Sequence, residues 1–123
     1  MLEVYSIDVA VAEATPIPFN NVSLEKGSTV TLSGTSTIQL NKCGVYMVAV
    51  DGVVETETTI QLYKDGVLQP QAQSGGVTLG FTTLVQVSHN NGNCCCQSPV
   101  TLQIINDTAT TFTNVNVVVT KVC

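Results

Sequence analysis

The feature that most constrains this chain is a strict alternation of side chains near its centre. Apolar or β-branched residues occupy every second position of one extended segment: Val77, Leu79, Phe81, Thr83, Val85 and Val87. Successive side chains point to opposite faces of a strand, whereas a helix would need apolar residues three and four positions apart. The pattern therefore predicts a half-buried strand. No segment of the chain shows the apolar stripe of an amphipathic helix.

The same alternation recurs along the chain between turn signals. We expect residues 1–13 to form an N-terminal strand, either within the fold or as an arm, with one face made by Tyr5, Ile7, Val9 and Val11. The nearly continuous apolar run from Val45 to Val50 predicts a central strand that is covered on both faces.

Turn residues divide the remaining strands. Asp65-Gly66 is a strong hairpin signal, so a new strand should begin at Val67, and Asn106-Asp107 should separate the last two strands. Turn signals at roughly ten-residue spacing indicate about 8 to 10 short strands. With 20 Val and 17 Thr, the chain is predicted to be all-β: a single jelly-roll β-sandwich domain spanning residues 1–123.

The charge balance excludes several classes of partner. The chain has no Arg, and its four Lys are outweighed by nine Asp and Glu, so the clustered cations of a nucleic-acid surface are missing. No apolar run approaches the length of a membrane span, and the start lacks a basic signal region. We therefore expect synthesis in the cytoplasm without a signal peptide. A surface of uncharged polar residues favours packing against copies of the same chain.

The cysteines suggest a reducing compartment rather than a disulfide framework. There are five, an odd number, and Cys94, Cys95 and Cys96 are consecutive. Three interpretations of this triplet stay open: ordinary loop thiols, disulfides between subunits, or a shared site for a soft metal. Together with His89, the single histidine, the triplet is the weak candidate for metal binding, because zinc-ligand spacing is absent.

No arrangement of residues predicts catalysis or cofactor binding. Ser88 and His89 are adjacent, so in a strand their side chains would point to opposite faces. Glu55 and Glu57 share a strand face, but nothing marks them as a glycosidase pair. We expect a protein that is not an enzyme and has no cofactor.

Several short motifs resemble one known family. They are Pro18-Phe19, Gly44-Val45-Tyr46, Ile60-Gln61-Leu62-Tyr63-Lys64-Asp65-Gly66, and the two final runs Val100–Asn106 and Val115–Lys121. In this order they resemble the trimeric jelly rolls of the complement C1q and tumour-necrosis-factor family, especially its small bacterial and phage members. The likeness spans roughly residues 14 to 122 and implies a homotrimer that packs its inner sheets around a threefold axis.

The predicted strands also carry more apolar surface than one sandwich needs. The candidates for the trimer interface or the core are Tyr46, Phe81, Leu84, Val85, Val87, Leu102 and Ile104. The resemblance implies a structural or attachment protein: a phage virion component, such as a head fibre, capsid decoration or tail attachment, or a bacterial surface protein. It would contact other virion or cell-surface proteins. The alternative is a lectin-like or receptor-binding module that recognises a host glycan or protein.

Overall fold

The computed structural model describes residues 1–87 and 100–122, and in this part of the chain it contains eight β-strands and no helix. The strands are β1 (Leu2–Val11), β2 (Asn21–Glu25), β3 (Val30–Ser33), β4 (Thr37–Leu40), β5 (Gly44–Lys64), β6 (Val67–Val87), β7 (Val100–Asn106) and β8 (Thr110–Lys121). The all-β prediction is confirmed. Over the same residues, no helix has the length and apolarity needed to cross a bilayer.

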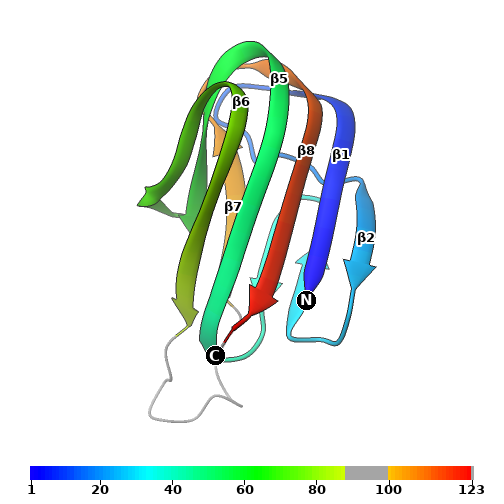
Figure 1. Cartoon of the computed structure of the whole chain (residues 1–123), viewed down its shortest axis with the longest axis vertical. Helices are drawn as coiled ribbons and strands as arrows, with labels where there is room; N and C mark the ends of the chain where they lie inside the picture. Colours follow the sequence, from blue (N-terminus) through cyan, green and yellow to red (C-terminus); the bar gives the residue numbers. More distant parts are fainter. Residues whose placement is uncertain (88–99, 123) are drawn as a thin grey trace.

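The strands form two layers that share their two longest members (Figure 1). The front sheet contains β2, β1, β8, the first half of β5 and the second half of β6. The back sheet contains β3, β4, β7 and the remaining halves of β5 and β6. The result is the jelly-roll sandwich that the sequence predicts, with the core between the layers.

Strands β5 and β6 are longer than the sequence pattern suggests. Each covers 21 residues and runs through both sheets, where separate short strands are expected from the spacing of turn signals. The pairing between them shifts between Val53 and Thr58, where the pair bends from one layer to the other. The hairpin turn is as predicted, because Asp65 and Gly66 have φ of 50° and 79°, and β6 begins at Val67.

The face of β1 that meets the core changes along the strand. Its first half buries Leu2, Val4 and Ser6. Ile7 is 60% exposed, while Val11, at the other end, is buried, so the prediction that both lie on one face with Tyr5 and Val9 is wrong.

The cause of this change lies in β8. Thr113 is an extra residue of β8 relative to β5, because Val53 pairs with Asn114 whereas Val54 pairs with Phe112. Asp8 of β1 stands opposite this extra residue with a φ of 52°. Both strands therefore reverse their inward faces at the same level, which is the effect of a β-bulge.

A proline-containing segment connects β1 to β2 and runs beside β7 of the back sheet on the way. Ile17 and Phe19 are buried, and their N–H groups donate to the carbonyls of Ile104 and Thr35 at 2.8 and 2.7 Å. The neighbouring residues Pro16 and Pro18 have no backbone N–H, so neither position needs a hydrogen-bond acceptor. The segment makes only an isolated bridge, from Pro16 to Ile105, because prolines cannot donate to a strand ladder.

Candidate functional site: the outer face of the front sheet

The outward side chains of β5 show that the front sheet has an unusually apolar outer face. Tyr46, Val48 and Val50 are buried in the core, and the residues between them point away from it. These outward residues are Val45, Met47 and Ala49, and they are only half-buried. The prediction that this run is covered on both faces is therefore wrong for the described part of the single chain, because none of its strands lies over the second face.

Strand register gathers further apolar residues around Met47 and Ala49. Met47 pairs with Leu84 of β6, and Ala49 pairs with Val118 of β8. Leu84 is 61% exposed, and Val118 is half-buried. We call these residues the outer patch: Val45, Met47, Ala49, Leu84 and Val118. Figure 1 is viewed toward this side of the front sheet.

Few charges lie beside the outer patch. In the next row toward the bend, Asp51 pairs with Gly80 on one side and Asn116 on the other, and it is exposed. At the β1 side, the carboxylate of Glu3 accepts hydrogen bonds from Ser23 and Asn116. Most of this face can thus be covered without removing a charge from water, a costly step for an unpaired ion.

The structure divides the residues that the sequence proposes for an interface or the core. Leu84 alone among them lies on the outer face, and Phe81 is half-buried against the core. The others are buried between the sheets: Tyr46, Val85, Val87, Leu102 and Ile104. Burial raises the pKa of Tyr46, whose hydroxyl donates to the carbonyl of Lys42 at 2.6 Å.

Four members of the outer patch escaped the sequence prediction: Val45, Met47, Ala49 and Val118. A signal for them was present in the sequence. Both Val45–Val50 and Val117–Val119 are continuous apolar runs, so each places apolar side chains on both faces of its strand.

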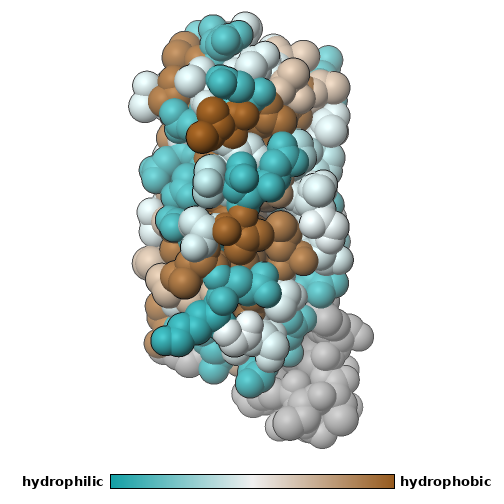
Figure 2. All heavy atoms as spheres, turned by 90° about the vertical axis from the view of Figure 1, so that its right-hand side faces the viewer, coloured by the Kyte–Doolittle hydropathy of each residue, from teal (hydrophilic) through white to brown (hydrophobic). Residues whose placement is uncertain are grey.

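A second group of exposed apolar residues lies on edge strand β2. Val22 and Leu24 are exposed, and every residue of β2 is accessible to solvent. Figure 2 faces this side of the molecule and shows apolar patches separated by polar atoms. Val22 and Leu24 are less exposed than Leu84. The outer patch also spans three adjacent strands, so we regard it as the stronger candidate.

The proposed metal ligands His89, Cys94, Cys95 and Cys96 lie outside the described residues. Within those residues, no three His, Cys, Asp or Glu side chains gather to hold a metal ion. Cys43 is buried and disulfide-bonded, which differs from the expectation of reduced thiols. Glu55 and Glu57 are both exposed at the bend of β5.

The fold is a TNF-like jelly roll, as comparison with solved structures shows. A crystal structure of rabbit GITRL superposes with a TM-score of 0.64 over 100% of this chain and 95% of that one, at 7% sequence identity. No family model matches the sequence, and no curated protein matches it.

Proposed function

We propose that the chain is a non-enzymatic structural or attachment module that works as a homotrimer. The observation that carries the proposal is the outer patch, a group of apolar side chains on a sheet face that no other described strand covers. Monomeric proteins rarely expose large contiguous apolar patches, and such patches mark interaction surfaces. Burial of the patch between copies would remove this surface from water.

The side chains of edge strand β6 support association on the same side. Among the described residues β6 pairs only with β5, and from Val67 to Val87 it contains no charged residue. Leu84 belongs both to this edge strand and to the outer patch, so one packing arrangement can cover both features.

The number of subunits and the biological setting rest on the family resemblance. The jelly rolls that this chain resembles form compact trimers, and the small bacterial and phage members are virion or surface components. We therefore propose a place in a phage virion, as a head fibre, capsid decoration or tail attachment, or on a bacterial surface. Electron microscopy of the source particle with this protein labelled tests the setting. Absence of label from virion and cell surface would contradict it.

Light scattering tests the trimer. The wild-type chain of 13.0 kDa should give about three times its own mass at micromolar concentration. Leu84→Asp places a carboxylate in the outer patch and should give a folded monomer, since the side chain is already exposed in the single chain. Val67→Asp is the matched control, because Val67 is 63% exposed on the same strand but lies at the hairpin turn.

Val85→Asp separates loss of assembly from loss of the fold. Val85 adjoins Leu84 but points inward and is 3% exposed, so an unpaired carboxylate there should cost several kcal/mol of folding stability. Circular dichroism should show a folded Leu84→Asp variant and a strongly destabilised Val85→Asp variant. A wild-type mass near 13.0 kDa would contradict the trimer, and a mass near twice that value would indicate a dimer instead.

A further inference from the structure

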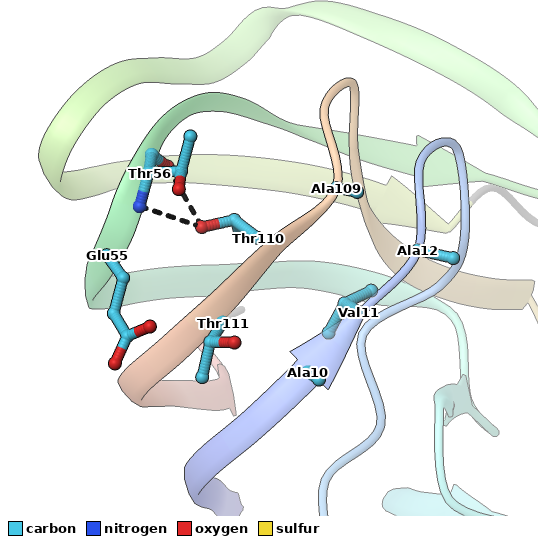
Figure 3. Close-up of a pocket in the computed structure, with 8 residues that line it drawn as sticks. All are labelled: Ala10, Val11, Ala12, Glu55, Thr56, Ala109, Thr110 and Thr111. Carbon is cyan, nitrogen blue, oxygen red and sulfur yellow. Dashed lines mark hydrogen bonds between the residues drawn. The ribbon is translucent and has the colours of Figure 1, made fainter.

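A groove of about 410 Å³ lies at the end of the molecule where β5 bends (Figure 3). Its walls come from the end of β1, the start of β8 with the turn before it, and the bend of β5. The lining residues are Ala10, Val11, Ala12, Glu55, Thr56, Ala109, Thr110 and Thr111. It lies beyond the row of Val53 and Asn114, away from the outer patch, so its occupation does not depend on the proposed trimer.

Local hydrogen bonding shapes the groove. The ladder between β5 and β8 ends at the pair Val54 and Phe112. Beyond this pair the side chain of Thr110 replaces a backbone partner: its Oγ1 accepts from the N–H of Thr56 at 3.0 Å and donates to the carbonyl of Thr56 at 2.9 Å. Figure 3 shows both bonds. β5 is thereby held to β8 while it turns toward the back sheet, and the small side chains leave the space between them open.

The groove combines methyl groups with a single ionic group. Ala10, Ala12 and Ala109 offer an apolar surface, and Glu55 is the one charged residue in the lining. The Glu55 carboxylate and the hydroxyls of Thr56 and Thr111 make no hydrogen bond with any other described residue. These oxygens can therefore accept hydrogen bonds from a ligand.

All four lysines lie away from the groove, whereas acidic residues lie at both ends of the molecule. Glu13 and Glu57 directly follow lining residues of the groove. Lys26, Lys42 and Lys121 lie near the opposite end: the N–H of Lys26 bonds to Met1, Lys42 precedes β5, and Lys121 pairs with Tyr46. The fourth lysine, Lys64, donates its ammonium group to the carbonyl of Gln86 at 2.7 Å, also toward that end. The groove thus faces solvent with an uncompensated negative charge.

We propose that this groove binds a lysine side chain presented by another protein. The methylene stem would pack on the alanine methyl groups, and the ammonium group would donate to Glu55 and the threonine hydroxyls. An arginine side chain fits less well, because a guanidinium group typically stacks on an aromatic face besides pairing with a carboxylate. The lining of the groove contains no aromatic residue. A hard divalent cation usually binds several oxygen ligands that include more than one carboxylate, whereas Glu55 is the one carboxylate in the lining of the groove.

Titration of the ¹⁵N-labelled protein with Nα-acetyl-lysine-N-methylamide tests the proposal by NMR. Amide shifts should saturate and should concentrate at Ala10, Ala109 and Thr111. The matched ligand is Nα-acetyl-norleucine-N-methylamide, which keeps the stem but lacks the ammonium group, and it should bind far more weakly. Glu55→Gln should weaken binding of the lysine probe roughly fivefold. Glu57→Gln removes the same charge one residue beyond the lining and should leave the affinity within about twofold.

Three results would overturn the proposal. Equal binding of the norleucine probe would show that the ammonium group plays no part. Equal weakening by the two glutamine variants would assign the effect to the general negative field of this end rather than to the groove. Shifts of the groove amides with protein concentration alone, abolished by substitution of this chain's own lysines, would identify a second copy as the occupant. The first two results do not bear on the trimer, which the mass measurement tests separately.

Discussion

At the scale of single residues, the buried hydroxyl of Ser6 joins β1 to the proline-containing segment. Ser6 is fully buried, its Oγ donates to the carbonyl of Pro18 at 2.7 Å, and the same oxygen accepts from the N–H of Asn20 at 2.9 Å. Both backbone groups lie directly before β2 begins at Asn21, where the chain has no strand partner. One small polar side chain thus satisfies two backbone groups that no strand ladder pairs.

Ser6→Ala should lower the free energy of unfolding by about 1–3 kcal/mol, because it leaves the Pro18 carbonyl and the Asn20 N–H unpaired. Urea denaturation at one fixed protein concentration measures the change. The control is Ser23→Ala, since Ser23 is exposed and donates to Glu3 at the surface. The control should cost less than about 0.5 kcal/mol. Similar losses for the two variants would contradict the role assigned to Ser6.

Asp107 makes stability depend on pH. Its carboxylate accepts from the N–H of Thr59 at 2.9 Å and from the hydroxyls of Thr108 and Thr58. The hydrogen bond from the Thr59 N–H is the largest cause that holds the pKa of this carboxyl below the ordinary value for aspartate. A carboxyl whose pKa is lower in the folded state stabilises the fold above its unfolded pKa, and this contribution is lost as the pH falls through the folded pKa.

Asp107→Asn should therefore be less stable than the wild type at pH 7, and the difference should shrink below about pH 4. Thermal melts of both proteins from pH 7 to pH 2.5 measure it. Asp51→Asn provides the comparison, because Asp51 is exposed on the outer face. A constant difference between wild type and Asp107→Asn across the whole range would show that the hydrogen bonds do not favour the charged form.

At the scale of elements, the edge of β6 carries side-chain caps on its own backbone. The N–H of Gly80 donates to Ser74 Oγ at 3.1 Å, and the carbonyl of Gln86 accepts from Lys64 Nζ at 2.7 Å. Residues 80 and 86 have the same parity in a strand whose only partner is β5, so both caps occupy polar groups that face away from β5. Such caps hinder the addition of a foreign strand at a long, uncharged edge.

Joint substitution of Lys64→Met and Ser74→Ala should speed aggregation severalfold while the melting temperature changes little. Thioflavin fluorescence during incubation below the melting temperature measures the rate. Lys42→Met is the control for loss of one positive charge, because Lys42 lies before β5 and away from this edge. Equal aggregation rates for the double variant and the control would refute a protective role for the caps.

Alternation predicted the strands well but failed where two strands interact to change face. Val85 and Val87 are buried and Leu84 is exposed, as the period-2 pattern requires. In β1 the same pattern wrongly placed Tyr5 and Ile7 on one face with Val11. The change of face at Asp8 lies opposite an extra residue in β8, more than a hundred positions along the chain. A local pattern in β1 cannot show where β8 has an extra residue.

At the scale of the whole molecule, the sequence predicted the class of fold and part of the candidate site. Turn residues located the hairpin at Asp65-Gly66 and the link after Asn106, and strand patterns supplied a core. The outer patch was harder to find. The face of β5 that carries Met47 and the face that carries Tyr46 are both apolar, and only the strand pairing shows which of them meets the core. The groove at Glu55 could not be found from sequence, since its walls come from three distant segments.

The sharing of β5 and β6 between the layers has a consequence for how the molecule opens. A sandwich made of separate sheets can slide or part along its middle while each sheet keeps its ladder. Here any parting must bend or break a hairpin whose strands run through both layers. The two halves of the sandwich are mechanically one body, so a force that pulls on the edge of one sheet is carried into the other through continuous backbone.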